Sequence, residues 1–180
     1  MIYLLDFFKN EVVIQIIGFV GMFLSIISFQ SKSYQKIVWL RVLSEFVFAV
    51  QYFLLGATTG MVTNLTSCVT NSVYRERIKR GKKVAGFQIA FGLLFAILGI
   101  LSWHGYVSLL AIAAKVLSTV ANGNANPKTI RIINLIISPL WLVYDIIVFS
   151  LAGVLSDAFT LVSIVLAMVR LDKSQAKELN

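Results

Sequence analysis

Seven apolar runs separated by short polar gaps are the feature that most constrains the fold of this chain. A transmembrane helix needs roughly 17 to 25 mostly apolar residues to cross the hydrocarbon core of a bilayer. Runs near this length occupy residues 12–29, 37–55, 61–74, 84–103, 106–121, 130–149 and 151–169, the third being shorter and rich in Thr, Ser and Asn. We therefore expect an all-α integral membrane protein with seven transmembrane helices.

The composition excludes a water-soluble globule. Of the 180 residues, 58% are hydrophobic and 13% are charged, and the mean hydropathy is +0.86. That leaves too little polar surface to cover a soluble protein of this size. A net charge of +8 suggests nucleic-acid binding in a soluble protein, but here the basic residues fall in short gaps between apolar runs. Nucleic acid is therefore not expected as a partner, and one Cys with one His leaves no zinc ligand set and no sign of a cofactor.

The basic residues predict the orientation in the membrane. The stretch RERIKRGKK at 75–83, expected to be a loop, holds six of the 16 Lys and Arg residues. With seven spans, thirteen basic residues fall on one side and Lys9 alone on the other. The seven outside this stretch are Lys32, Lys36, Lys128, Arg131, Arg170, Lys173 and Lys177. Because short cytoplasmic loops are enriched in Lys and Arg, we expect the N-terminus outside and the C-terminus in the cytoplasm.

An internal repeat is visible when the chain is shifted on itself by 93 residues. Leu24 and Ser25 then align with Leu117 and Ser118, and Asn64 aligns with Asp157. The first three spans correspond to the last three, and the fourth restores the orientation between two odd-numbered copies. We expect a 3+1+3 parallel repeat: a first three-helix bundle at 1–83, a linker helix at 84–104 and a second bundle at 105–180.

This layout resembles the SWEET and PQ-loop (MtN3-like) group of membrane transporters. In finer detail, AVQYFLLG at 49–56, the basic stretch closing the third span and WLVYDIIVFSLAG at 141–153 resemble the YgjV-type proteins of the bacterial inner membrane. The Pro-Gln pair of the PQ-loop group is replaced by Phe29-Gln30 and Asn122-Gly123. The resemblance implies a multi-pass protein of the bacterial plasma (inner) membrane that moves a solute by alternating access.

Five ionisable residues interrupt the apolar runs: Arg41, Glu45, Lys115, Asp145 and Asp157. Each costs roughly 2.5 to 3.5 kcal/mol on insertion scales, so each needs a partner, an aqueous cavity or a function. Arg41 and Glu45 are four residues apart and share a helix face, which favours an ion pair. For Arg41 and Lys115 the alternative is that the side chain extends along the helix to the membrane surface.

Residues that could bind a solute follow from the repeat and the resemblance. In the SWEET pattern, asparagines on the third and seventh spans face the substrate, which implies that role for Asn64 and Asp157. Asn71 follows Asn64 at helical spacing on the third span. The alternative is that both asparagines hydrogen-bond neighbouring helices. Glu45, deep in the second span, joins this candidate set.

Gln51 and Tyr144 coincide at the repeat offset, and Asp145 follows Tyr144, so these three are expected to form an outer gate. The aromatic residues Tyr52, Trp103 and Tyr106 are expected to lie at the membrane interface.

The sequence predicts a transporter or facilitator for a small polar solute, sugar-like or vitamin-like. The alternative is a receptor or structural protein with the same fold. The chain contains no nucleophile elbow, phosphate-binding glycine loop or metal motif, so an enzyme is not expected. The expected partners are the lipid bilayer and a small polar solute, and a homo-oligomer is left open.

Overall fold

The computed structural model describes residues 11–103 and 105–172. The basic residues Lys9, Lys173 and Lys177 lie outside these ranges. The described chain is all-helical and contains seven α-helices followed by a short π-helical segment. These are α2 (Glu11–Phe29), α3 (Tyr34–Leu54), α4 (Thr58–Lys79), α5 (Ala85–Leu101), α6 (Ser108–Asn122), α7 (Pro127–Ile147), α8 (Leu151–Ala167) and η1 (Met168–Asp172).

Local sequence signals explain several helix ends. Asn126 caps α7, because its side chain accepts a hydrogen bond from the Lys128 amide, and Pro127 occupies the first helical turn. Ser150 caps α8 by accepting from the Gly153 amide. After α3, Gly56 adopts φ +72°, a left-handed conformation that ends the helix and that glycine takes without strain.

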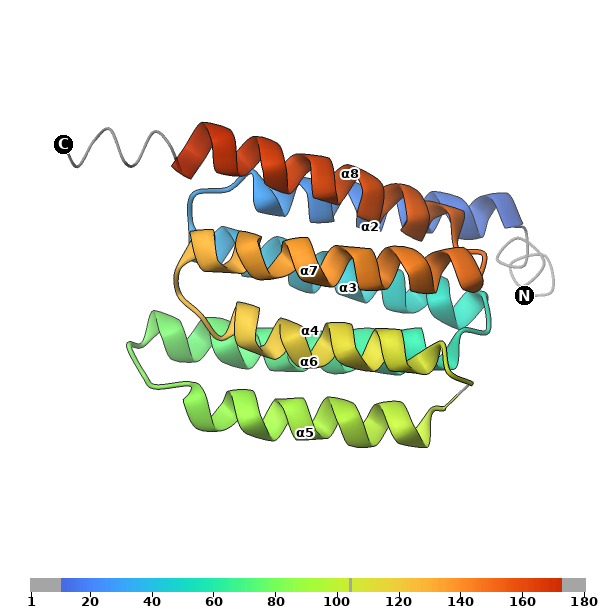
Figure 1. Ribbon diagram of the computed structural model, residues 1–180, viewed down its shortest axis with the longest axis horizontal. Helices are drawn as coiled ribbons and strands as arrows, with labels where there is room; N and C mark the ends of the chain where they lie inside the picture. The colour runs from blue at the N-terminus through green and yellow to red at the C-terminus, as the bar shows by residue number, and fades with distance from the viewer. Residues whose placement is uncertain (1–10, 104, 173–180) are drawn as a thin grey trace, which may run out of the picture.

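The helices lie side by side, and successive helices run in opposite directions (Figure 1). Six of them form a closed ring in the order α2, α3, α4, α6, α7 and α8, with α8 packed back against α2. Helix α5 stands outside the ring and packs against α6 and α4. Consistent with that position, Phe95 and Gly99 are the two residues of α5 that are buried.

The two ends of the bundle differ in charge. The connections α2–α3, α4–α5 and α6–α7 lie at one end together with the last turn of α8 (Figure 1). We call this the basic end, because the described Lys and Arg residues outside the helix interiors lie there, from Lys32 to Arg170. The start of α2 and the other three connections form the opposite end.

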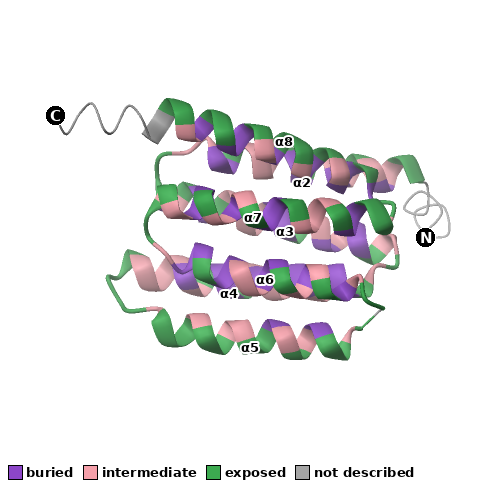
Figure 2. Ribbon diagram, in the orientation of Figure 1, coloured by how far each residue is buried: buried purple, intermediate pink, exposed green. Residues whose placement is uncertain are grey.

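Each helix carries both exposed and buried residues (Figure 2), and many large apolar residues are among the exposed ones while many polar residues are among the buried ones. Exposed examples are Val12, Ile89, Leu101 and Leu166, whereas the buried set includes many Ser, Thr and Asn residues. This arrangement suits a chain whose outer solvent is lipid, where polar groups must find partners inside the protein.

Four helical segments are long and apolar enough to cross a membrane: Glu11–Phe29, Tyr34–Leu54, Pro127–Ile147 and Leu151–Arg170. The other three expected spans differ in length or polarity. Helices α5 and α6 are apolar but have 17 and 15 residues, and α4 has 22 residues and is polar. The polarity of α4 has a structural reason, since its Thr, Ser and Asn side chains are buried against α3 and α6.

The basic stretch at 75–83 is not the loop expected from the sequence. Helix α4 continues through it to Lys79, so the connection to α5 is confined to residues 80–84. The long basic side chains are good helix formers, and the i,i+4 pair of Glu76 with Arg80, at 2.6 Å, supports the last turn. Arg77 caps the connection by donating to the Lys83 carbonyl, at 2.9 and 3.1 Å.

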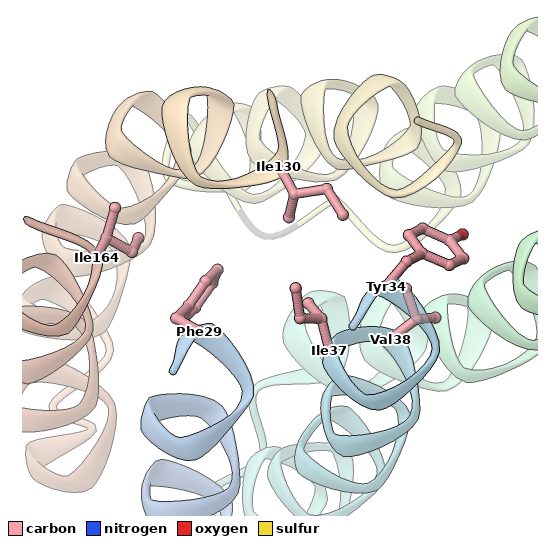
Figure 3. Close-up of a cluster of buried hydrophobic side chains, with 6 residues drawn as sticks. All are labelled: Phe29, Tyr34, Ile37, Val38, Ile130 and Ile164. Carbon is pink, nitrogen blue, oxygen red and sulfur yellow. The ribbon is translucent and has the colours of Figure 1, made fainter. Parts of the chain in front are cut away.

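Apolar clusters lie towards both ends of the ring. At the basic end, Phe29, Tyr34, Ile37, Val38, Ile130 and Ile164 converge from α2, α3, α7 and α8 (Figure 3). We call this the basic-end cluster. Towards the opposite end, a second cluster is built on Tyr52, Ala111 and Tyr144, with Phe48, Met61 and Trp141 packed against it. We call this the opposite-end cluster.

Candidate functional site

A polar cavity of about 80 Å³ lies between the two apolar clusters, inside the ring of six helices. That volume is enough for several water molecules, since roughly 10 to 15 Å³ holds the first. All five ionisable residues of the apolar runs line it: Arg41, Glu45, Lys115, Asp145 and Asp157. The chain therefore gathers into one place the side chains that are most costly to put in a membrane.

Glu45 is the centre of a network of buried side chains. One carboxylate oxygen, Oε1, lies 3.4 Å from the Lys115 ammonium and 3.9 Å from the Arg41 guanidinium. The other, Oε2, accepts a hydrogen bond of 2.8 Å from Asn71, which in turn accepts one of 2.8 Å from Asn122. The exposed fractions of the Glu45 and Lys115 side chains are 9% and 3%. The intrahelical pair expected between Arg41 and Glu45 is present, and Glu45 bonds to a second cation as well.

The Lys115 side chain points into the bundle and finds its partners there. Its ammonium donates to Asn64 Oδ1 at 2.9 Å and to Glu45, and it lies 5.2 Å from the centre of the Trp141 ring. Asn64 is fixed in turn by donating to the Gly60 carbonyl at 2.9 Å. The alternative that Lys115 reaches the membrane surface is therefore wrong.

Arg41 also points inward. Its Nη1 donates to Asn134 Oδ1 on α7 at 2.9 Å, and its guanidinium lies 5.5 Å from the centre of the Phe29 ring. Asn134 donates to the Ile130 carbonyl at 2.7 Å, which holds its Oδ1 towards Arg41. Arg41 thus links α3 to α7 and does not extend to the basic surface.

The other end of the cavity is acidic. Tyr52 donates a 2.6 Å hydrogen bond to Asp145 Oδ1, and the neighbouring carboxyl group of Asp157 lines the same cavity. Gly153 makes room for this pair, because a Cβ atom there would collide with Asp145 Oδ2. The Oδ2 atom of Asp157 is shielded from solvent and has no hydrogen-bond partner among the described residues.

Aromatic rings form the wall between the acidic pair and the Glu45 network. Tyr52 stacks on Phe48 and Trp141 with ring centres 6.2 and 6.4 Å apart, and Tyr144 meets both Tyr52 and Trp141 edge-on. Phe48, Tyr52 and Trp141 reach the cavity. Tyr52 is buried and hydrogen-bonded, so the expectation that it lies at the membrane interface is wrong. Trp103 and Tyr106 are exposed at the opposite end.

The residues proposed from the sequence divide into two groups. Asn64, Asp157, Asp145 and Glu45 line the cavity, and Asn71 lies one hydrogen bond behind it. Gln51 and Tyr144 do not line it.

Gln51 and Tyr144 face other helices. Gln51 is buried against α2, where its amide lies 3.4 Å from Gln15 and where a Cβ on Gly18 would meet it. The hydroxyl of Tyr144 lies near Gly60 of α4. A one-residue step turns the side chain about 100° around a helix, which is why Tyr52 and Asp145 face the cavity and the residues before them do not.

Several cavity residues escaped the sequence reasoning, although a signal for two of them was available. The repeat offset pairs Arg41 with Asn134 and Tyr52 with Asp145, and both pairs are hydrogen-bonded. Applying the offset to every polar residue of the second span would have found Asn134 and Tyr52. For Trp141 and Asn122 the sequence contains no comparable signal.

Seven helices with an apolar exterior, four of them long enough to cross a bilayer, and a buried set of charges define a multi-pass helical membrane protein with a polar internal cavity. The chain belongs to the Imp-YgjV family of bacterial inner membrane proteins, whose family model matches residues 12–175. Searches of curated proteins and of solved structures found no match to this chain.

Proposed function

We propose that this protein is a transporter or facilitator for a small polar solute, of sugar-like or vitamin-like size, that works by alternating access. The observation that carries the proposal is the charged cavity between the first and second groups of three helices, to which both groups contribute. Repeat-built transporters bind their substrates at such an interface near the middle of the membrane.

The helix contacts support two equivalent halves. The contacts of α2 with α3 and of α3 with α4 correspond to those of α6 with α7 and of α7 with α8. The contact of α2 with α8 likewise corresponds to that of α6 with α4. Helices α2 and α6 also point the same way (Figure 1), which supports a rotation axis parallel to the helices between the two halves. Helix α5, at 85–101, acts as the linker, and the arrangement is a 3+1+3 parallel repeat.

Two hydrogen bonds give the position of the axis. Arg41 with Asn134, and Tyr52 with Asp145, are both separated by 93 residues, the repeat offset. Equivalent residues of two halves touch only when both lie near the axis that relates them. The axis therefore runs between α3 and α7, through the cavity.

The two halves differ in chemistry where they correspond. Asn71 and Asn122 are hydrogen-bonded, and their equivalents at the offset, Ile164 and Phe29, pack together in the basic-end cluster. The polar version supports Glu45 from behind, and the apolar version closes the end of the ring. Because the two halves share a fold but differ in polarity at equivalent positions, the site between them is asymmetric and suits a solute that binds in one orientation.

The apolar clusters provide the two gates that alternating access requires. The basic-end cluster contributes Phe29 to the cavity lining and the opposite-end cluster contributes Tyr52, so each cluster borders the cavity. Rocking of one half against the other about the axis would open one cluster while compressing the other. The basic end faces the cytoplasm in this scheme, because Lys and Arg concentrate there, and the N-terminus lies outside. All seven α-helices cross the membrane, and the chain has no catalytic role.

The competing function is that of a receptor or structural protein. The mutual pairing of Glu45, Lys115 and Asn64 favours it, because polar groups that already have partners do not need a solute. Cysteine accessibility separates the two. Ser138 lines the cavity, so Ser138→Cys is placed in a Cys68→Ala background and treated with a membrane-impermeant methanethiosulfonate reagent. Intact cells expose one face of the membrane, and inverted vesicles expose the other.

A transporter is expected to be labelled at position 138 from both faces, because each gate opens in turn. The matched control is Ser28→Cys, a buried serine outside the cavity lining, which is expected to stay unlabelled from either face. Failure to label position 138 from either face, or labelling from one face alone, would reject transport in favour of the competing function.

A further inference from the structure

We infer that the solute carries a protonated amine, and that this ammonium group binds between Asp145 and Asp157 at the acidic end of the cavity. The inference rests on the proposed function and narrows its substrate class. It starts from how the charges are paired. Arg41 and Lys115, the cations of the cavity lining, both lie against the single carboxylate of Glu45, whereas Tyr52 is the one side chain outside the acidic pair seen to donate to it in the described part.

The acidic pair has the chemistry of an unfilled cation site. Two carboxylates in contact repel each other unless a proton or a cation lies between them, and removing them from water makes an uncompensated charge costly. Asp157 Oδ2 is cut off from solvent without a donor, in a wall of the cavity. The unsatisfied acceptor thus belongs to a residue that lines the cavity, where a solute would bind.

An ammonium group fits these acceptors better than the alternatives. It offers three N–H donors and a positive charge, whereas a sugar hydroxyl offers one donor and no charge. Charge-assisted hydrogen bonds to carboxylates are about twice as strong as neutral ones. At this end of the cavity an anionic solute would meet two carboxylates, while Arg41 and Lys115 lie against Glu45.

The aromatic wall supports the same class of solute. The faces of Trp and Tyr rings attract cations through the ring quadrupole. Lys115 demonstrates this within the cavity, since its ammonium already lies over the Trp141 ring. Tyr52, which bonds to Asp145, stacks on the same tryptophan, so the ammonium at the acidic pair would have an aromatic neighbour of the same kind.

Trp141 allows the binding to be observed at the site. The other two tryptophans, Trp39 and Trp103, are exposed, so Trp39→Phe with Trp103→Phe leaves Trp141 as the single emitter. The purified protein in detergent is titrated at constant ionic strength with ethanolammonium chloride. Ethylene glycol, which replaces the ammonium with a hydroxyl, and glycolate, which replaces it with a carboxylate, are the matched solutes, and sodium is the inorganic cation.

The expected result is a saturable change in Trp141 emission with ethanolammonium and none with the other three solutes. Asp157→Asn is expected to weaken the apparent affinity about 10- to 100-fold, as for loss of one charged hydrogen-bond partner. Glu76→Gln, which removes an exposed carboxylate at the basic end, is expected to leave it unchanged.

Each other outcome overturns the inference. An equal response to ethylene glycol would assign the cavity to neutral solutes, and an equal response to sodium would assign the acidic pair to an inorganic cation. No response to ethanolammonium would reject the amine even if Asp157→Asn fails to fold, because the titration of the protein that retains Asp157 stands alone. Each of these three failures leaves transport intact if Ser138→Cys is labelled from both faces, whereas failure of that labelling rejects the proposed function itself.

Discussion

Loss of the Glu45 charge is the perturbation with the largest expected effect on stability. In Glu45→Gln the shape is kept, but Arg41 and Lys115 remain in the bundle without a counter-charge. Their side chains are only 12% and 3% exposed, so little water can replace the lost carboxylate. Breaking a buried ion pair in this way costs about 3 to 5 kcal/mol, because the remaining charge is buried and uncompensated. At 1.4 kcal/mol per tenfold, the unfolding equilibrium shifts by about 100- to 4,000-fold.

Equilibrium unfolding in mixed dodecylmaltoside and SDS micelles measures this free energy. Glu76→Gln is the matched control, since it removes the same charge from an exposed pair with Arg80, and it is expected to leave the transition in place. Lys115→Met is expected to cost less than Glu45→Gln, because Glu45 keeps Arg41 as its partner. Combining Glu45→Gln with Lys115→Met should therefore recover part of the loss, and a coupling of about 0.5 to 3 kcal/mol is typical of residues in contact.

Two results would refute the proposed role of Glu45 as the counter-charge of Arg41 and Lys115. If Glu45→Gln unfolds within about 0.5 kcal/mol of the wild type, the range expected of ordinary surface substitutions, the network contributes nothing to stability and the buried charges must be solvated. If the two substitutions are additive, Glu45 and Lys115 are not partners.

Three further predictions follow from single contacts. Tyr52→Phe leaves Asp145 Oδ1 without its donor and should lower the free energy of unfolding by about 1 to 3 kcal/mol. The control Tyr106→Phe, at the exposed surface, should leave this free energy unchanged. Equal effects of the two substitutions would show that the Tyr52–Asp145 hydrogen bond is not formed. Gly153→Ala should lower the free energy of unfolding by about 1 to 3 kcal/mol, because its Cβ would collide with Asp145 Oδ2. The control Gly86→Ala, with nothing within 4 Å of the added Cβ, should stabilise α5 by about 0.5 to 1 kcal/mol. A Gly153→Ala protein as stable as the wild type would contradict the crowding at the acidic pair. In a Cys68→Ala background, Tyr106→Cys should react with an impermeant thiol reagent on intact cells, whereas Ala125→Cys should react only in inverted vesicles. Both positions are exposed and lack the positive φ that makes substitution at Gly81 or Gly105 unfavourable. The reverse labelling pattern would show that the orientation is inverted.

The helices were predictable because lipid leaves few choices. Long apolar runs must be helical when no water is present to satisfy the backbone, so hydropathy predicted most of the helices, although only four of the described helical segments are long and apolar enough to cross a membrane and α4 is polar. The end of α4 was missed because hydropathy stops at Tyr74, while the helix continues through basic residues that favour helical structure.

Part of the cavity lining was predictable, because placing ionisable residues in a membrane span costs free energy. Glu45, Asp145 and Asp157 stood out because ionisable side chains are expensive in apolar runs, and Asn64 was chosen through the repeat and the family resemblance; the structure puts all four in the cavity lining. Gln51 and Tyr144 were chosen for their agreement in the repeat, which gives depth along the helix but not the direction of the side chain. The pairing of Lys115 with Asn64 depends on which faces of α4 and α6 meet, and a single sequence does not encode that in any local pattern.

The central claim is that two three-helix halves rock against each other around the cavity, and paired distance measurements test it most directly. Spin labels are placed at Lys36 and Lys128 at the basic end, and in a second sample at Thr58 and Leu151 at the opposite end, all of them exposed. Each pair places one label on each half. In lipid nanodiscs the account predicts two distance populations for each pair, with conditions that favour the longer distance at one end favouring the shorter at the other. A single narrow distance at both ends under all conditions would contradict it.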